Sequence, residues 1–294
     1  MTAARLPPVY AGDAIAWAAR RLGRARLAYG HGTDNPVDEA AALVFHAAGW
    51  PHASAPAAYR WALPRSARAE LVRLVGRRIQ ERIPAAYLTG VTWFAGHEIR
   101  VDERVLVPRS PLAELIETRF GPFIEAGRVR RILDIGTGSG CIAIACAYAF
   151  PEAEVDAVDV SHGALEVAGD NVRRHGLEGR MHVRLSDVYA GLGARRYDII
   201  VSNPPYVPDA DVRRLPAEYR HEPRRGLAAG RDGLDAVRAI LKGARAHLAP
   251  RGILVVEVGD SRPAVERAWP KLPFLWLEFE RGGGGVFLLT MEKG

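Results

Sequence analysis

Cysteines and long hydrophobic segments are both scarce in this sequence. The 294 residues include two cysteines, Cys141 and Cys146, and both lie in an apolar segment. We therefore expect neither a disulfide scaffold nor a cysteine-based zinc site, and we expect both thiols to pack as small buried side chains. No segment approaches the roughly 20 consecutive apolar residues of a membrane span, and the N-terminus lacks a signal-peptide pattern. These absences predict a soluble, cytoplasmic protein that has no membrane partner.

Lysine is absent from the first 100 residues, which contain 13 arginines and 7 acidic residues. This part of the chain therefore carries a charge of +6, equal to the formal net charge of the whole protein, and the remaining residues are balanced. Such a concentration of arginine has two interpretations. It can attract an anionic partner such as ribosomal RNA, or it can form solvated faces of helices. The sequence alone favours neither interpretation.

The pattern of apolar residues predicts a small helical domain over residues 1–90. Across residues 13–82, apolar side chains recur at the spacing of amphipathic helices, and glycine and proline interrupt the pattern twice. Asp34 or Asn35 is expected to cap the helix that begins near Pro36, because both residue types accept hydrogen bonds from the first turn.

Residues 91–110 differ from the helical part because they are rich in β-branched and aromatic side chains. These side chains surround a candidate turn at Ala95-Gly96, which is typical of a hairpin. We therefore predict a β-hairpin linker, in which Trp93 and Phe94 fill a small core.

The remaining residues, 111–294, alternate between apolar strands and amphipathic helices. This alternation predicts an α/β, Rossmann-like domain with a mostly parallel seven-stranded sheet that ends in an antiparallel hairpin. Strands are expected at residues 131–135, 153–158, 183–185, 197–202, 252–258, 275–280 and 285–290, and helices at residues 140–150, 163–175 and 234–248.

A glycine-rich loop follows the first strand of this domain and leads directly into a helix. Glycines allow a sharp turn and a close approach to a ligand, while the free amides at the start of the helix favour a polar group. Asp159, about twenty residues later, ends the second strand, where a carboxylate can accept hydrogen bonds from both hydroxyls of a ribose. We therefore predict an adenosine site whose loop consists of Asp134, Gly136, Thr137, Gly138, Ser139 and Gly140.

The loop lacks the features of two other nucleotide sites. No lysine is near it, as a P-loop requires, and Cys141 stands where a dinucleotide fingerprint places glycine or alanine. The D-x-G-x-G-x-G spacing resembles that of S-adenosylmethionine-dependent methyltransferases. Asp187 follows the third strand and is either a contact for the adenine amino group or a cap of the strand end.

Asn203-Pro204-Pro205-Tyr206 follows the strand at residues 197–202, so it is expected at the same edge of the sheet as the glycine loop. The Asn203 side-chain oxygen and the Pro204 carbonyl can each accept one N–H of a planar amino group and orient its nitrogen toward a methyl donor. The two prolines restrict the backbone, and Tyr206 offers an aromatic face to the planar group and to a cationic donor. We therefore predict these four residues to be catalytic, with Asn203 also at the cofactor.

The Asn-Pro-Pro-Tyr sequence does not by itself distinguish an adenine base from a glutamine side chain, because both present a planar NH₂ group. An adenine methyltransferase that acts on DNA must also extrude the base and usually carries a sizeable target-recognition domain. About eighty residues follow this sequence here, and a small helical domain precedes it. N6-adenine methylation of nucleic acid and a noncatalytic adenosine-binding assembly factor remain alternatives.

Together these segments resemble the HemK/PrmC/PrmB family of protein-(glutamine-N5) methyltransferases. The resemblance extends over nearly the whole chain and includes Ile83-Pro84 and Val107-Pro108-Arg109. The sequence after Arg109 departs from the Pro-Arg-Pro-Glu-Thr-Glu of release-factor methyltransferases and is similar to the branch that modifies ribosomal protein uL3. The resemblance implies S-adenosylmethionine as donor and a glutamine of uL3 as acceptor, with a release factor as the alternative. Arg109 and Glu257 lie in family-like segments, and the sequence assigns them no role.

Overall fold

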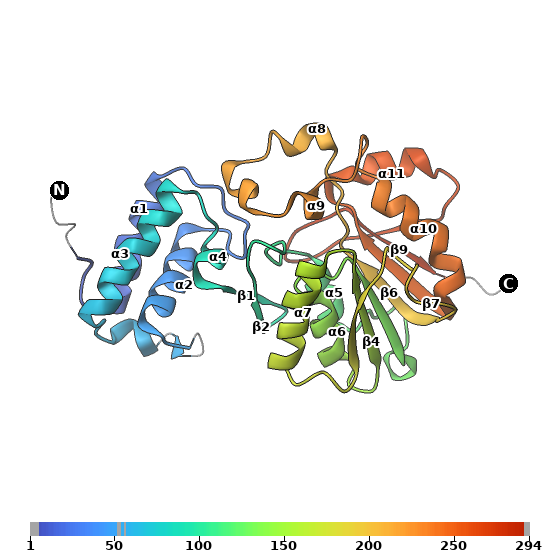
Figure 1. Cartoon of the computed structure of the whole chain (residues 1–294), viewed down its shortest axis with the longest axis horizontal. Coiled ribbons are helices and arrows are strands. Elements are labelled where there is room, and N and C mark those ends of the chain that lie inside the picture. The colour runs from blue at the N-terminus through green and yellow to red at the C-terminus, as the bar shows by residue number, and fades with distance from the viewer. Residues whose placement is uncertain (1–5, 52–53, 56, 291–294) are drawn as a thin grey trace. The chain divides into compact units, whose positions relative to one another are not determined.

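The computed structural model describes residues 6–51, 54–55 and 57–290, and it divides them into two compact units. Unit 1 comprises the N-terminal residues up to Thr92 together with a short segment, residues 216–221. Unit 2 comprises residues 93–215 and 222–294. Figure 1 labels the elements of both units.

Unit 1 is helical, as the apolar spacing predicts. Asn35 caps α2, because its side-chain oxygen accepts hydrogen bonds from the amides of Val37 at 3.0 Å and Asp38 at 2.9 Å. Leu22, Leu43, Phe45, Leu71 and Leu74 are among the buried side chains of its core. Its elements are α1 (Ala11–Arg24), α2 (Pro36–Ala48), the 3₁₀ helix η2 (Ala57–Arg60), α3 (Arg65–Gln80), α4 (Ala85–Thr89) and η4 (Ala217–His221).

A buried ion cluster joins the segment 216–221 to the helices of unit 1. Arg78 on α3 is fully buried and donates hydrogen bonds to Glu39 at 2.8 Å and to Glu218 at 3.2 Å. Glu218 also accepts from the amide of Ala28 at 3.0 Å and from Arg82 at 3.3 Å. Burial raises the pKa of Glu39, although Arg78 opposes that shift. Each buried charge thus has an opposite charge and additional hydrogen bonds as partners.

The expected hairpin is present, with β1 (Val91–Phe94) and β2 (His97–Arg100) joined at Ala95 and Gly96, which both have positive φ. Phe94 is 5% exposed, as expected for a core residue. The prediction for Trp93 is wrong, because its side chain is 43% exposed. Successive side chains of a strand point to opposite faces, so the two neighbours cannot both fill one core.

The seven-stranded sheet of unit 2 has the strand order β5-β4-β3-β6-β7-β9-β8. The first five strands in this order are parallel, and β9 pairs antiparallel with both β7 and β8. The chain moves outward from β3 in both directions, so the carboxyl ends of β3 and β6 form the switch point where open α/β sheets bind ligands. The strands are β3 (Arg131–Ile135), β4 (Glu154–Asp159), β5 (Met181–Leu185), β6 (Tyr197–Ser202), β7 (Leu248–Glu257), β8 (Leu275–Leu277) and β9 (Val286–Thr290).

Helices cover both faces of this sheet (Figure 1). On one face, Leu133 and Ile200 pack against Val237, Ile240 and other apolar residues of α10. The other face is covered by α6, in which both cysteines are buried and free, as expected. The helices of unit 2 are α5 (Leu112–Glu117), η3 (Ala126–Arg128), α6 (Cys141–Ala149), α7 (His162–Arg174), α8 (Asp209–Val212), α9 (Arg224–Leu227), α10 (Asp235–His247), η5 (Gly259–Ser261) and α11 (Arg262–Ala268).

The predicted fold class is therefore confirmed, including the mostly parallel seven-stranded sheet and the antiparallel hairpin at its edge. The strand expected at residues 275–280 is shorter, since β8 ends at Leu277. Among the described helices, none is both long and apolar enough to cross a membrane.

Candidate active site

The glycine loop connects β3 to α6 in a conformation that depends on its glycines. Gly136, Gly138 and Gly140 all have positive φ, at 72°, 55° and 82°. The amides of Gly136 and Thr137 donate to the carbonyl of Val158 at 2.8 and 2.9 Å, which fixes the loop against the end of β4. The loop therefore lies between the carboxyl ends of two neighbouring strands.

Asp134 lies beneath this loop, and one of its carboxylate oxygens has no partner among the described residues. Oδ2 accepts a hydrogen bond from Thr137 Oγ1 at 2.6 Å, whereas Oδ1 is buried without a hydrogen-bond partner. Burial, with a smaller contribution from the charge of Asp159, raises the pKa of Asp134 to about 7, although hydrogen bonds from Thr137 and the backbone of Ala143 lower it. A buried acceptor of this kind is costly unless something binds to it. A ligand with a cationic or N–H group near the loop fits this observation.

Asp159 ends β4 with a half-buried carboxylate. Its Oδ2 accepts from the amide of Gly138 at 3.0 Å, and its Oδ1 accepts from the amide of Ser161 at 2.9 Å. Each oxygen retains a lone pair for a further donor. The structure thus brings Asp134 and Asp159 to the loop. Asp187 is exposed and follows β5, the edge strand next to β4.

Asn203-Pro204-Pro205-Tyr206 begins where β6 ends, and β6 is the parallel neighbour of β3. The Ser202 hydroxyl donates to the carbonyl of Ile135 at 2.7 Å, so the residue before Asn203 is bonded to the residue before Gly136. This contact fixes the register between the two segments. Asn203 is half-buried, and Pro204 and Pro205 hold its backbone with two fixed φ angles and no N–H donors.

Tyr206 is held at its backbone, its ring and its hydroxyl. Ser261 Oγ donates to its carbonyl at 2.8 Å, and its hydroxyl donates to Glu257 Oε1 at 3.3 Å. The ring packs on the backbone of Gly259, where an added Cβ would lie 2.7 Å from a ring carbon. Gly259 also has a φ of +47°, so a side chain there would be both strained and obstructed.

Glu257 is the other buried carboxyl of the site. It ends β7, and its Oε2 accepts a hydrogen bond from Ser110 Oγ at 2.5 Å. Burial raises the pKa of Glu257 to about 7, although the hydrogen bonds from Ser110 and Tyr206 and the charge of Arg109 lower it.

Arg109 makes a bidentate ion pair with Glu222. The guanidinium donates to the two carboxylate oxygens at 2.5 and 2.6 Å, and the amide of Val107 donates to the same carboxylate at 3.1 Å. The Glu222 side chain is fully buried. Glu222 is also the residue at which the chain returns to unit 2 after residues 216–221. The ion pair therefore fixes one end of the long connection that follows Tyr206.

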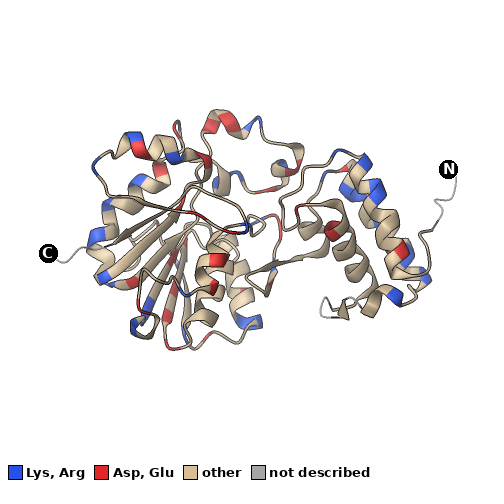
Figure 2. Ribbon diagram, turned by 180° about the vertical axis from the view of Figure 1, so that it is seen from behind, with Lys and Arg blue, Asp and Glu red and all other residues tan. Residues whose placement is uncertain are grey.

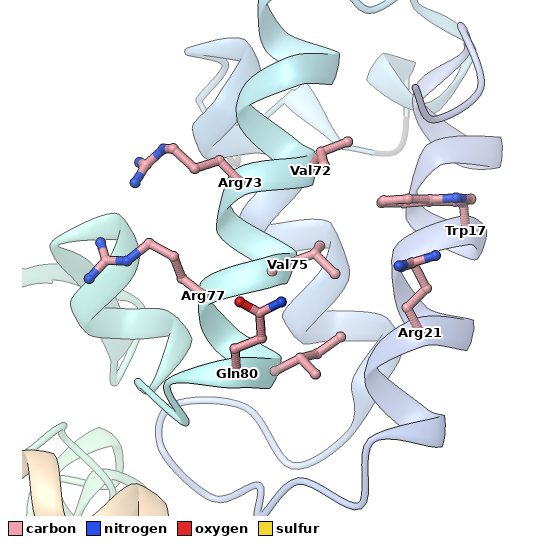
Figure 3. A pocket seen from close by; sticks show the side chains of 9 residues that line it. Trp17, Arg21, Val72, Arg73, Val75, Arg77 and Gln80 are labelled. Atoms are coloured by element: carbon pink, nitrogen blue, oxygen red, sulfur yellow. The ribbon is translucent and has the colours of Figure 1, made fainter. Parts of the chain in front are cut away.

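Unit 1 contains a separate hollow of about 440 Å³ between α1 and α3 (Figure 3). Val72, Val75 and Ile79 give it an apolar lining, and Trp17 faces them from α1. The Arg21 guanidinium lies 5.0 Å from the centre of the Trp17 ring. None of the residues expected to be catalytic lines this hollow.

Comparisons with known proteins identify the family. The PrmC N-terminal domain family matches residues 13–90, and the methyltransferase small domain family matches residues 119–218. The chain is 48% identical to the ribosomal protein uL3 glutamine methyltransferase of Bordetella pertussis, over 96% of this chain and 95% of that protein. The chain belongs to the family of ribosomal protein uL3 glutamine methyltransferases. The protein of the same name from Neisseria meningitidis serogroup A is 47% identical, over 96% of this chain and 93% of the relative.

Solved structures agree on the fold. The catalytic domain of hMettl16, in complex with MAT2A 3′UTR hairpin 6, superposes with a TM-score of 0.52 at 18% identity, covering 76% of this chain and 80% of that one. At this identity the likeness concerns the fold alone. The predicted resemblance to S-adenosylmethionine-dependent glutamine methyltransferases is confirmed by the family, and the chain is a methyltransferase that uses this cofactor.

Sequence reasoning missed the residues that support Tyr206. The sequence assigns no role to Glu257, and it gives no signal for Ser110, Ser261 or Gly259, whose contacts appear only in the structure. The only signal was the position of Glu257 at the end of an apolar strand, since a carboxylate after a buried strand marks the ligand-binding edge of such a sheet.

Proposed function

We propose that this protein transfers the methyl group of S-adenosylmethionine to the side-chain nitrogen, N5, of a glutamine in ribosomal protein uL3. The observation that carries the proposal is the bond between Ser202 and Ile135, which places Asn203 and the glycine loop side by side at one edge of the sheet. Curated relatives that match almost the whole chain bear the name of this activity.

The glycine loop and the two aspartates next to it would hold the cofactor. Gly136, Thr137, Gly138, Ser139 and Gly140 supply the turn and the close backbone approach, and Asp159 supplies acceptors for ribose hydroxyls. Asp134 Oδ1 is suited to the cationic amino group of the methionine part, because it is a buried acceptor without a partner among the described residues. When bound, S-adenosylmethionine supplies a methyl group activated by its sulfonium charge. Asp187, which follows β5, would contact the adenine amino group.

Asn203 and Pro204 would orient the glutamine amide. The lone pair of an amide nitrogen is delocalised, so the nitrogen attacks poorly unless it is held in line with the methyl carbon. The Asn203 side-chain oxygen and the Pro204 carbonyl can each accept one of the two N–H groups. Pro205 restricts the backbone between them and Tyr206, whose ring lies against the planar amide. The methylated nitrogen then loses a proton that is acidic enough for water to accept, so the site needs no strong base.

We propose that unit 1, with the helical domain at residues 1–90, recognises the substrate while residues 111–294 carry the chemistry. Figure 2 shows Lys and Arg positions along the helices of unit 1. Arg20, Arg21 and Arg24 on α1 are exposed, and the described residues provide no acidic partner for them. These charges suit ribosomal RNA next to uL3, so the proposed substrate is a ribosome assembly intermediate in the cytoplasm.

Labelled S-adenosylmethionine tests the proposal. The purified protein is incubated with large ribosomal subunits from cells that lack the enzyme, and label is measured separately in uL3, in other proteins and in RNA. The proposal predicts label in uL3. Label in RNA supports an adenine methyltransferase instead, label only in added release factors supports the other branch of the family, and no label supports a binding module.

A further inference from the structure

Glu257 is a buried carboxyl, and its desolvation lowers the stability of the fold. The residue is 5% exposed, and it lies at the end of a strand whose other residues near this end, Val255 and Val256, are apolar and fully buried. An apolar side chain of similar size would avoid the desolvation of a carboxylate. Buried titratable groups with perturbed pKa values cluster at functional sites for this reason.

The hydrogen bonds around Glu257 have a definite direction. Ser110 Oγ accepts from the amide of Leu112 at 3.2 Å, which leaves its own proton for Glu257 Oε2. The Tyr206 hydroxyl donates its proton to Oε1. Glu257 is the acceptor in both contacts, and an ionised carboxylate suits this arrangement because it provides two acceptor oxygens and no donor.

The Tyr206 hydroxyl is the far end of a ring whose other contacts are rigid. Gly259 supports the ring from its backbone, and Ser261 holds the carbonyl. Packing against Gly259 therefore limits rotation of the Tyr206 ring, and the hydrogen bond to Glu257 holds its hydroxyl. A phenol that donates to an anion also has a more electron-rich ring, which binds cations more strongly.

We propose that Glu257 is a positioning residue for methyl transfer, and that its ionised carboxylate holds the Tyr206 hydroxyl and thereby sets the orientation and electron density of the ring. The inference rests on the proposed function, in which Tyr206 lies against the substrate amide. Glu257 acts through Tyr206 and does not itself touch the reacting atoms.

A pH dependence follows from the charge of Glu257. The charged and titratable groups that face Glu257 are Arg109, which is paired with Glu222, and the Tyr206 phenol. Below the pKa of Glu257, which is about 7, the carboxyl is neutral, so the Tyr206 hydroxyl no longer donates to an anion and its hydrogen bond weakens. Turnover therefore rises with pH through about 7 and is level above it.

Nuclear magnetic resonance tests the coupling without any methyl transfer. The full-length protein carries tyrosine labelled with ¹³C at Cζ, and the signal of Tyr206 is assigned by its loss in Tyr206→Phe. The inference predicts that this signal shifts with a midpoint near pH 7 and that the shift disappears in Glu257→Gln. In Ser110→Ala the midpoint moves upward, because the Ser110 hydrogen bond lowers the pKa of Glu257. A Tyr206 signal that is constant across pH 7 overturns the inference.

Kinetics on uL3 test the consequence for turnover. Glu257→Gln should lower kcat roughly tenfold at high pH and abolish the rise through pH 7, with the KM for the cofactor changed less than about twofold. The matched control is Asp260→Asn, which removes an exposed carboxylate three positions away and should leave kcat and its pH profile unchanged. A Glu257→Gln enzyme with the wild-type profile contradicts the inference. If wild-type protein does not methylate uL3, the proposed function fails, and the Tyr206 signal still decides whether Glu257 holds the ring.

Discussion

Unit 1 buries the Arg78 guanidinium between two carboxylates, whereas unit 2 lines its candidate site with backbone groups, hydroxyls, an amide and two buried carboxyls. Residues 1–100 carry a charge of +6, equal to the net charge of the protein, and the residues that follow are balanced. In unit 2, burial raises the pKa values of both Asp134 and Glu257 to about 7.

This contrast indicates a division of tasks between the units. In unit 1, the charge of Arg78 stabilises the fold by pairing with Glu39 and Glu218. We propose that the exposed arginines of this unit attract an anionic partner. Methylation of an amide needs acceptors at fixed positions more than it needs charge, and Ser202, Ser261 and the two prolines fix the acceptors of unit 2. Substitutions in each unit should therefore affect different measurements.

The largest effect is expected for the stability of unit 1. Arg78→Met leaves Glu39 and Glu218 buried without their shared cation, which should cost about 3–5 kcal/mol. Hydrogen-exchange mass spectrometry should show this as lost protection in α3, with protection in β3 and β6 retained. The control is Arg77→Met on the same helix, whose ion pair with Glu81 is exposed and should contribute about 1 kcal/mol or less. Equal protection of α3 in both variants would show that the buried cluster is unimportant.

Turnover should depend next on Asn203. Asn203→Ala removes an acceptor that orients the substrate amide and should lower kcat roughly 10²-fold, while cofactor binding is retained. Asn203→Gln is the matched variant, because it keeps the amide and displaces it by one methylene, and it should lose most of the activity as well. Steady-state kinetics and isothermal titration calorimetry measure the two quantities. Normal turnover in either variant would refute the assigned role.

Cofactor affinity should depend on Asp159. Asp159→Ala removes an acceptor for ribose hydroxyls and the partner of the Gly138 amide, and it should weaken binding of S-adenosylmethionine roughly tenfold. The kcat at saturating cofactor should change little. Asp187→Ala provides the comparison and should have a smaller effect, since Asp187 is exposed. An unchanged dissociation constant for Asp159→Ala counts against the ribose contact.

The smallest effect is expected for the arginines of α1. Replacing Arg20, Arg21 and Arg24 with glutamine should lower kcat/KM on ribosomal particles roughly two- to fivefold and make it less sensitive to salt. The effect should vanish when isolated uL3 is the substrate. Arg73, which pairs with Glu70 on its own helix, offers a matched control. An unaltered salt dependence would identify the α1 arginines as a solvated helix face.

Much of the fold was predictable because its signals are local. The alternation of strands and helices, the Asn35 cap and the glycine loop can all be read from neighbouring residues. The segment 216–221 could not be assigned to unit 1 in this way, because Glu218 bonds to Arg78 across 140 positions of the chain. Trp93 was misplaced because an aromatic residue on a two-stranded hairpin can face either side.

In the candidate site, too, the residues that are neighbours in the sequence were predictable, and the contacts between distant residues were not. Asn203 to Tyr206 and the loop at residues 134–140 are each contiguous, so their residue types alone indicated a site. Tyr206 is supported by Glu257 and Ser261, which lie 51 and 55 positions away in the chain, and Glu257 is bonded to Ser110 across 147 positions, so only the structure brings these residues together. These contacts depend on the folded positions of the residues, which a single sequence does not give.

The most direct test of the central claim is tandem mass spectrometry of uL3. Large-subunit particles from cells lacking the enzyme are treated with the wild-type protein or with Asn203→Ala, and each peptide of uL3 is searched for added methyl groups. The account predicts one methyl on the side-chain nitrogen of a glutamine after treatment with the wild-type protein, and far less with the variant. Methylation at any other residue type, or equal methylation by both proteins, would contradict it.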